Sequence, residues 1–184
     1  GFSAPVLMMT SGGGLTTVET ARRIPVRLVE SGPAGGAILA AAIARDLAEE
    51  RLLAFDMGGT TAKLTMIEGG IARTARTFEV DRSARFMKGS GLPIRIPVIE
   101  MVEIGAGGGS LARVDAMGRL RVGPDSAGSE PGPVAYGRGG ERPAVTDADL
   151  LLGHLDADAF AGGTMRLDTD AATAAMERTV DGKA

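Results

Sequence analysis

Short apolar runs separated by glycine-rich turns dominate the pattern of hydrophobic and polar positions along this chain. Runs of apolar or alternating residues predict strands, and apolar residues that recur every three or four positions predict helices. The expected strands cover residues 5–10, 26–30, 52–57, 61–68, 71–79 and 94–104, with a further hairpin at 111–115 and 119–122, and the expected helices cover 15–23, 34–51, 147–153 and 170–180.

The clearest helix is the one expected at 34–51. Its apolar residues stand four positions apart in two neighbouring rows, which is the stripe of an amphipathic helix. Charged residues crowd its far end. The members of the stripe are Ile38 and Ala42 in one row and Leu39, Ile43 and Leu47 in the other.

Polar side chains predict where two later helices begin. Thr146-Asp147 is expected to cap the helix at 147–153, and Asp168 or Thr169 is expected to cap the last helix. Such side chains accept hydrogen bonds from the first free amides of a helix.

The three apolar runs between residues 52 and 79 are too close together for parallel pairing. Gly58-Gly59-Thr60 joins the first run to the second, and Gly69-Gly70 joins the second to the third. A parallel connection needs about a dozen residues or more, so antiparallel hairpins are expected. A polar connection is expected at 82–93, and a long ordered loop or linker, rich in Gly and Pro, at 123–143.

Composition narrows the class of protein. The chain has 184 residues, of which 44% are hydrophobic, so it can bury a core and is expected to be one domain or a large piece of a bigger one. No second domain boundary is visible, and the first five residues suggest an internal cut from a longer protein rather than a signal peptide.

The same composition excludes several kinds of chemistry. The chain has no Cys, which excludes disulfides, a cysteine nucleophile and thiolate metal sites, and its single His excludes a two-histidine zinc site. The net charge is −3 and no Lys/Arg block occurs, so nucleic-acid binding has little electrostatic support. No apolar stretch approaches the ~20 residues of a membrane span.

The segment from Asp56 to Thr61 (Asp-Met-Gly-Gly-Thr-Thr) is the sharpest chemical feature. Gly58 and Gly59 let the main chain approach a ligand closely, and successive amides in such a turn form a concave anion site. Asp56 could hold a hydrated Mg²⁺ that bridges phosphate oxygens, and the hydroxyls of Thr60 and Thr61 add donors. The turn therefore predicts a phosphate clamp on a β-hairpin, and the alternative is a tight hairpin with an Asp at its mouth. It is neither a Walker A loop nor a dinucleotide fingerprint, because no lysine motif is present and a strand follows the turn.

Two further glycine-rich turns share this theme. The first contains Gly32, Gly35 and Gly36 before a helix, where the helix dipole and free amides favour anions, or where the glycines serve ordinary capping and packing. The second lies between residues 105 and 110, where close approach of the main chain to a ligand and a structural turn are equally good explanations. Its candidate binding residues are Gly105, Gly107, Gly108, Gly109 and Ser110.

Other polar residues are weaker candidates for chemistry. Glu100 and Glu103 would point to opposite faces of a strand, so they do not form a ready acid/base pair. Lys63 could pair with phosphate, although a solvated face explains it as well. His154 is expected near a helix end, where the dipole alone favours it, and Arg138 could contact a partner or substrate.

Seven motifs occur in an order that resembles one known family, the hydantoinase A / 5-oxoprolinase family, from about Val6 to Asp168. That family includes N-methylhydantoinases, oxoprolinases and subunits of acetone and acetophenone carboxylases. One motif would be weak support, whereas the ordered set is strong. The motifs are Ser31-Gly-Pro-Ala-Gly-Gly36, Asp56-Met-Gly-Gly-Thr60, Ile104-Gly-Ala-Gly-Gly-Gly-Ser110, Val122-Gly-Pro-Asp-Ser-Ala-Gly128, Pro131-Gly-Pro133, Tyr136-Gly-Arg-Gly-Gly140 and Val145-Thr-Asp-Ala-Asp149.

The resemblance implies an α/β fold of the actin/Hsp70/sugar-kinase (ribonuclease H-like) ATPase type. Residues 1–184 would be a single fragment from the central part, the second ATPase half, of a larger subunit, since the family's first phosphate hairpin is missing. Asp56 to Thr60 would be one of the phosphate-binding hairpins, with Asp56, Lys63 and Glu100 as catalytic candidates and Asp56 as the metal ligand. The implied cofactors are ATP and Mg²⁺, with Mn²⁺ or another divalent metal as alternatives.

Two departures from the family pattern point to a distinct subgroup. Many members read Asp-Met-Gly-Gly-Thr-Ser-Thr-Asp, and here the last Asp is Lys63. Many also carry an Asp-x-His pair before the glycine run, where this chain has Glu100 and Val102. The first change exchanges a metal contact for a phosphate contact, and the second removes a histidine-based metal or proton-transfer role.

The resemblance therefore implies an ATP-dependent cyclic-amide hydrolase that phosphorylates a lactam or hydantoin carbonyl and then hydrolyses the ring C–N bond. The implied partners are a small cyclic amide, a hydantoinase B-type subunit or domain and the remainder of the same chain, in the cytoplasm, without nucleic acid or membrane. The isolated fragment is expected to be inactive. The alternatives are a subunit of an ATP-dependent ketone carboxylase and a non-catalytic interaction module.

Overall fold

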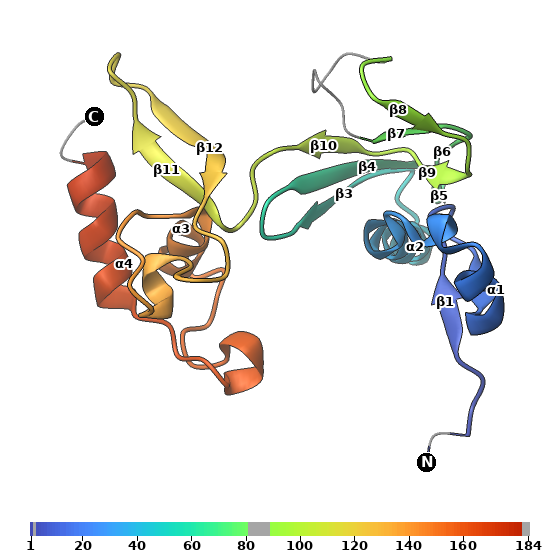
Figure 1. Cartoon of the computed structure of the whole chain (residues 1–184), viewed down its shortest axis with the longest axis horizontal. Coiled ribbons are helices and arrows are strands. Elements are labelled where there is room, and N and C mark those ends of the chain that lie inside the picture. Colours follow the sequence, from blue (N-terminus) through green and yellow to red (C-terminus); the bar gives the residue numbers. More distant parts are fainter. Residues whose placement is uncertain (2, 81–88, 182–184) are drawn as a thin grey trace. The chain divides into compact units, whose positions relative to one another are not determined.

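The computed structural model describes residues 1, 3–80 and 89–181 and divides the chain into two compact units of mixed α/β structure (Figure 1). The first unit comprises Gly1–Asp56 and Lys63–Val102, and the second comprises Met57–Ala62 and Glu103–Ala184. The division passes through a hairpin rather than through a polar linker. For that reason the composition of the sequence shows no boundary.

The first unit opens with a short antiparallel pair of strands. β1 (Leu7–Met9) pairs with β2 (Leu15–Thr17), and α1 (Val18–Arg23) follows directly. The strand prediction for 5–10 is confirmed at its centre. The helix prediction for 15–23 is correct only in its second part, because its first three residues pair with β1.

The strand expected at 26–30 is wrong. The segment forms a 3₁₀ helix, η1 (Pro25–Leu28), with Pro25 in the first turn. Proline suits that position because its fixed φ matches a helix and its missing N–H has no partner there anyway. Over so few residues, alternation of apolar and polar side chains does not distinguish the two kinds of element.

Helix α2 (Ser31–Asp46) replaces the helix expected at 34–51 and ends one turn earlier. After Asp46 the chain leaves the helix through Ala48, which has a φ of 54°, and the N–H of Glu49 donates back into the last turn. A left-handed residue just past the end is a common way to close a helix.

The apolar stripe expected on α2 is not its buried face. The buried residues are alanines at steps of three and four, and they pack against Ile67 and Ile99 in the core of the first unit. Helical periodicity places these alanines on one side and the large aliphatic residues largely on others. The buried alanines are Ala34, Ala37, Ala41 and Ala44, and the exposed large residues are Ile38, Leu39, Ile43 and Leu47.

Strands β3 (Arg51–Met57) and β4 (Ala62–Glu68) are neighbours in one sheet and confirm the strands expected at 52–57 and 61–68. Their four-residue connection requires an antiparallel hairpin. β5 (Ile71–Ala72) returns antiparallel along the end of β4, which confirms the second expected hairpin.

The single strand expected at 71–79 is wrong, because the segment divides among three partners. After β5 the chain forms β6 (Thr74–Ala75), which pairs antiparallel with β9 (Val98–Ile99). Then β7 (Phe78–Val80) pairs antiparallel with β8 (Leu92–Ile94). Each piece is short because each finds a different neighbour.

The strand expected at 94–104 is broken in the same way, with Pro97 standing between β8 and β9. Its last part is β10 (Val102–Ile104), where the chain passes from the first unit to the second. Of the polar connection expected at 82–93, residues 82–88 lie outside the described residues, and Leu92 already belongs to β8.

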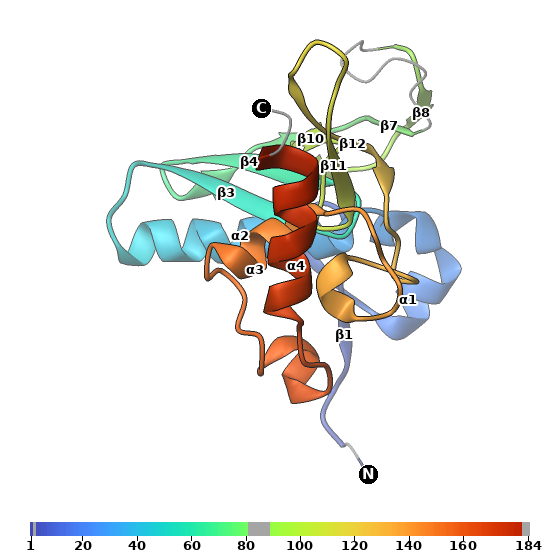
Figure 2. The same ribbon diagram turned by 90° about the vertical axis from the view of Figure 1, so that its left-hand side faces the viewer.

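The second unit begins with the predicted hairpin of β11 (Ser110–Val114) and β12 (Leu120–Ser126), which pair antiparallel. Helices α3 (Val145–Leu151) and α4 (Thr169–Met176) then pack together (Figures 1 and 2). A π-helical turn, η4 (Glu177–Asp181), continues α4. A small core fills the space around these helices, made by Ala135, Leu150, Leu167 and Ala172.

The polar caps are confirmed for one helix and corrected for the other. Asp168 caps α4 by accepting a hydrogen bond from the N–H of Ala171 at 2.9 Å. Thr146 and Asp147, expected to cap α3, lie inside it, and Ala144 holds the N-cap position. Asp147 instead reaches back and accepts from the N–H of Ala144 at 2.7 Å, because it stands three residues into the helix.

Of the loop expected at 123–143, residues 123–126 belong to β12, and the remainder contains the 3₁₀ helix η2 (Val134–Tyr136). A second 3₁₀ segment, η3 (Phe160–Gly163), lies between α3 and α4. In the part of the chain that the structure describes, no helix is long and apolar enough to span a membrane.

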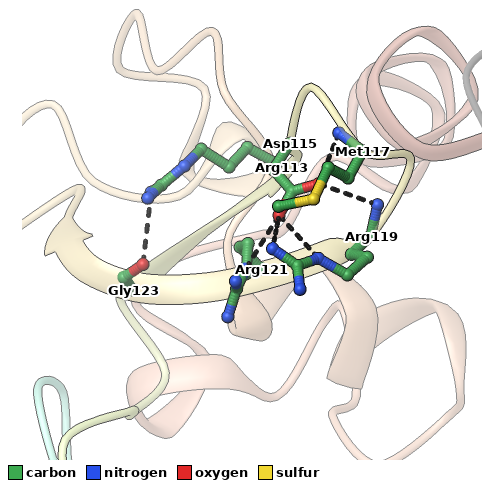
Figure 3. A network of polar contacts seen from close by, with 6 residues as sticks. All are labelled: Arg113, Asp115, Met117, Arg119, Arg121 and Gly123. Atoms are coloured by element: carbon green, nitrogen blue, oxygen red, sulfur yellow. Dashed lines mark hydrogen bonds and ion pairs between the residues drawn. The ribbon is translucent and has the colours of Figure 1, made fainter.

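A carboxylate organises the tip of the β11–β12 hairpin (Figure 3). Asp115 accepts hydrogen bonds from the N–H groups of Met117 and Arg119 at 2.9 and 3.0 Å. The Nε atoms of Arg119 and Arg121 both donate to its second oxygen at 3.1 Å. The pKa of Asp115 is lowered to about 2, chiefly by the hydrogen bond from the amide of Arg119. Desolvation opposes this shift, and the guanidinium groups of Arg121 and Arg119 and the amide of Met117 contribute to it.

This lowered pKa predicts a loss of stability in acid. A carboxyl that binds protons less readily when folded stabilises the folded state above its unfolded pKa, and the contribution disappears as pH falls from 3.8 towards about 2. Urea unfolding of the protein and of the Asp115→Asn variant between pH 5 and about 2 measures this. The difference in stability between them is expected to shrink as pH falls, and a constant difference would contradict the assignment.

Candidate functional site

The tip of the β3–β4 hairpin, residues 57–62, belongs to the second unit. The N–H of Gly58 donates to the carbonyl of Thr61 at 2.9 Å and closes a tight turn. Gly59 and Thr60 are exposed, and among the described residues their N–H groups have no protein acceptor. A Cβ on Gly59 would meet no atom within 4 Å, and its φ lies outside the left-handed region. Neither packing nor backbone conformation therefore requires glycine there.

The glycine run at 105–110 packs main chain against main chain on this tip. The N–H groups of Gly108 and Gly109 donate to the carbonyls of Gly58 and Gly59 at 2.9 and 2.7 Å. A Cβ on Gly107 would lie 2.6 Å from the carbonyl oxygen of Gly58, so only glycine allows this approach. These glycines are explained by packing, and their amides are already engaged.

Ser110 completes the second turn from inside. Its side chain is buried, and its Oγ accepts a hydrogen bond from the N–H of Gly107 at 2.9 Å. Its own N–H donates to the carbonyl of Gly107. Gly105, Gly107, Ser110 and Thr61 support the turns but do not line the cavity beside them.

A cavity of about 460 Å³ lies beside the two turns within the second unit. Its volume is in the range of pockets that hold small ligands. The lining includes glycines and hydroxyl-bearing residues as well as apolar and aromatic side chains. The lining residues are Met57, Gly58, Gly59, Thr60, Gly108, Gly109, Ser126, Gly128, Ser129, Pro133, Tyr136, Thr146, Asp149, Leu155 and Phe160.

Ten of the fifteen lining residues were not identified as site candidates from the sequence, and three of these carry an aromatic ring or a carboxylate. The rings of Tyr136 and Phe160 lie 5.5 Å apart between centroids, tilted by 42°. Asp149 of α3 supplies the cavity's carboxylate, with its Oδ1 3.5 Å from Nδ1 of His154. Tyr136 and Asp149 could have been found because they belong to two of the ordered motifs. No motif or local sequence pattern indicates Phe160.

A buried carboxylate fixes the wall that carries Tyr136. Asp147 is fully buried and accepts hydrogen bonds from the N–H groups of Val134 and Ala135 at 3.3 and 2.7 Å, besides that of Ala144. One side chain thus ties the Gly/Pro-rich loop to α3. Since buried polar groups need partners, each of these contacts supports the others.

The predicted metal and phosphate ligands Asp56 and Lys63 belong to the first unit, where both line a smaller hollow of about 190 Å³. Asp56 is exposed. Nζ of Lys63 lies 2.5 Å from Oε2 of Glu30, the residue before α2, which has a φ of 61°. The charge of Lys63 is therefore matched by a protein carboxylate.

The remaining predicted binding residues also lie in the first unit. Gly32, Gly35 and Gly36 are in the first turns of α2, and Gly36 lines the smaller hollow. Glu100 is exposed between β9 and β10, and its N–H donates to the carbonyl of Arg73 at 2.8 Å. Over residues 1, 3–80 and 89–181, no group of three or more His, Asp or Glu side chains is placed to hold a metal ion.

Comparison with known proteins gives a consistent result. The model of the hydantoinase/oxoprolinase family matches residues 1–182. An uncharacterised protein from Methanocaldococcus jannaschii is 41% identical over 184 residues, covering 98% of this chain and 27% of the relative. The alpha subunit of caprolactamase from Pseudomonas jessenii is 38% identical over 180 residues, covering 98% of this chain and 25% of the subunit.

Solved structures agree with these relatives. The nucleotide-free structure of an ATP-dependent acetone carboxylase has a TM-score of 0.71 at 27% identity, covering 97% of this chain and 24% of the other. The ATP-dependent caprolactamase from Pseudomonas jessenii has a TM-score of 0.67 at 36% identity. The match covers 95% of this chain and 24% of the caprolactamase chain. The chain spans about a quarter of the length of each of these proteins.

Proposed function

Because the chain belongs to the hydantoinase/oxoprolinase family, we propose that it is the nucleotide-binding part of an ATP-dependent enzyme that hydrolyses a cyclic amide. Two relatives support the use of ATP, since the caprolactamase and the acetone carboxylase are both described as ATP-dependent. We extend the proposal to the fold, which we assign to the actin/Hsp70/sugar-kinase type.

The free donors of the β3–β4 tip carry this proposal. The amides of Gly59 and Thr60 have no protein acceptor among the described residues, and both residues line the cavity. Amides held in a fixed turn stabilise phosphate oxygens without reorganising during the reaction. Gly59 also leaves open the space that a side chain would take from a phosphate.

The proposed reaction transfers the γ-phosphoryl group of ATP to the amide oxygen. The carbonyl oxygen forms a bond to phosphorus as the bond to the β-phosphate oxygen breaks, and ADP leaves. Water then adds to the activated carbon, and the ring C–N bond breaks with proton transfer to nitrogen, which leaves an acyl phosphate. A second water hydrolyses the acyl phosphate and releases the carboxylate and inorganic phosphate. The tip would position the phosphates, which is the main task of a protein in phosphoryl transfer.

Asp56 fits the requirement for a magnesium ligand. Mg²⁺ is commonly held by one or two carboxylates together with phosphate oxygens and water. Asp56 is exposed, directly precedes the tip in the chain, and has no ion pair or side-chain hydrogen bond among the described residues. Bound there, the ion would neutralise phosphate charge. Lys63 could join only by leaving Glu30, and Glu100 remains a candidate for proton transfer.

The test is the binding of Mg-ATP to the full-length protein and its Gly59→Ala variant by calorimetry. The added methyl would displace a phosphate oxygen from the tip, so affinity is expected to fall about tenfold, the size of one charge-assisted hydrogen bond. Unfolding in urea should change little, because the new Cβ meets no protein atom within 4 Å.

Gly14→Ala is the matched control. Gly14 is also exposed, has no left-handed φ and would meet only Thr10 at 3.7 Å, but it belongs to the first unit and not to the tip. Its variant should bind Mg-ATP like the natural protein. Absence of Mg-ATP binding to the full-length protein would overturn the nucleotide function and favour an interaction module, and unchanged affinity in Gly59→Ala would remove the tip from the site.

A ketone carboxylase is the second candidate, favoured by the TM-score of 0.71 to acetone carboxylase. Both candidates share the ATP step and the proposed partner subunits, since several relatives are named as subunits. They differ in the second substrate. ATP turnover that requires bicarbonate and a ketone would support the carboxylase, and turnover with a lactam or hydantoin alone would support the hydrolase.

A further inference from the structure

The lining of the cavity in the second unit combines two chemically different sets of residues. The β3–β4 tip supplies free amides, and Tyr136, Phe160 and Leu155 supply apolar surface. A triphosphate group alone would gain no favourable contact from the aromatic side chains of Tyr136 and Phe160. A ligand with charge at one end and a flat ring at the other would match both.

The aromatic wall is held in place by its surroundings. Tyr136 and Phe160 are half-buried and pack on the core of the second unit, and Pro133 lies beside them in the lining. A Cβ on Gly132 would lie 2.6 Å from Cδ2 of Tyr136, so glycine is needed for the ring to lie where it does. The guanidinium of Arg138 stands over the same ring at 6.0 Å. A ring fixed in this way can stack on a ligand without being ordered first.

The carboxylate of Asp149 is a third feature of the lining. Its side chain is 31% exposed and lines the cavity, with His154 against one oxygen. A carboxylate repels phosphate but accepts hydrogen bonds from the hydroxyl groups of a sugar, as in dinucleotide sites. In its own neighbourhood it therefore disfavours phosphate and favours a ribose.

We propose that the Tyr136–Phe160 pair stacks on the nucleotide base and that Asp149 accepts a hydrogen bond from the ribose hydroxyls. This assignment rests on the proposed function, because it names the nucleoside end of the same site. Every base has a π-face on which an aromatic ring can stack. The Tyr136–Phe160 pair is therefore expected to increase affinity without distinguishing strongly between bases.

The experiment compares Mg-ATP with inorganic tripolyphosphate on the full-length protein by calorimetry. ATP is expected to bind on the order of tenfold more tightly, which is the size of one stacking contact. Tyr136→Leu should lose most of that advantage and leave tripolyphosphate affinity unchanged, whereas Tyr136→Phe should keep it. Phe55→Leu is the control, since Phe55 is an exposed aromatic residue of the first unit.

A second comparison tests Asp149 by measuring the preference for ATP over 2′-deoxyATP. A purely structural role of Asp149 would not affect this preference. The natural protein should prefer ATP over 2′-deoxyATP by several-fold, and the preference should vanish in Asp149→Asn. If the preference stays, or if Tyr136→Leu weakens ATP and tripolyphosphate equally, the nucleoside assignment is overturned. Equal binding of ATP and tripolyphosphate to the natural protein also overturns it but leaves the phosphate tip standing. Binding of neither ligand instead removes the proposed function itself.

Discussion

Asp147→Ala is expected to destabilise the protein by about 3 to 9 kcal/mol, since three buried amides would lose their acceptor at about 1 to 3 kcal/mol each. The amides belong to Val134, Ala135 and Ala144, and the carboxylate that serves them is fully buried. A domain has only about 5 to 15 kcal/mol of stability in total, so the variant should be close to unfolding at room temperature. Urea denaturation followed by circular dichroism measures the change.

Asp149→Asn serves as the matched comparison for this prediction. It removes a carboxylate from the same helix, but one that is partly exposed and accepts no amide hydrogen bond with its side chain among the described residues. Its free energy of unfolding should stay within about 0.5 kcal/mol of the natural protein. If Asp147→Ala unfolds at the same urea concentration as Asp149→Asn, the loop is not held by this carboxylate.

Gly107→Ala is expected to be the most damaging of the glycine substitutions in the two facing turns. The new Cβ would lie 2.6 Å from the carbonyl oxygen of Gly58 and 2.6 Å from the nitrogen of Thr60. Both obstacles are main-chain atoms, which cannot rotate aside, so the turns must separate. Overpacking of this kind costs about 1 to 3 kcal/mol, and each hydrogen bond lost between the turns adds about 0.5 to 1.5 kcal/mol.

The separation should also abolish ATP binding, because the tip would lose the support that fixes its amides. We expect a fall in affinity of more than about a hundredfold, the effect of some 3 kcal/mol. Unfolding and calorimetry on Gly107→Ala and Gly59→Ala together provide the contrast: the first should lose stability and binding, the second binding alone. Equal stability of the two variants would show that the turns do not depend on this close contact.

The hairpins of this fold could be predicted from local sequence, whereas the pairing of its short strands could not. Gly58 to Thr61 and Gly69-Gly70 leave so few connecting residues that antiparallel return is required. The segments 71–79 and 94–104 look like single apolar runs, but each is divided among partners that lie elsewhere in the chain. The choice of partner strand depends on tertiary structure. The alternation of apolar and polar residues along a strand does not specify it.

Helix α2 shows a similar limit for burial. Ile38, Leu39, Ile43 and Leu47 have the spacing of a buried stripe, yet alanines pack against the strands. Hydrophobicity ranks leucine above alanine for burial, but the space left between this helix and its neighbours suits a methyl group. The fit between the surface of α2 and that of the packed strands decides which face of the helix is buried. A sequence pattern does not show this fit.

For the candidate site, the sequence predicted the β3–β4 tip and the second glycine turn, and the structure places the two turns in contact. Gly107, Gly108 and Gly109 permit this contact, whereas a Cβ on Gly59 would meet no atom within 4 Å. Tyr136 and Phe160 come from separate loops, so their meeting could not be predicted from spacing. Whether the tip binds phosphate stays a prediction.

The division of the chain through the β3–β4 hairpin has a consequence for how these units can be inherited and engineered. Residues 57–62 lie between two strands of the first unit but count with the second. A gene cut at Val102 would therefore give a downstream product without the carbonyls that Gly108 and Gly109 bind, and its cavity would lack one wall. In the sequence, a segment of the second unit lies between two segments of the first. Recombination or truncation at a single point therefore cannot separate the complete site from the first unit.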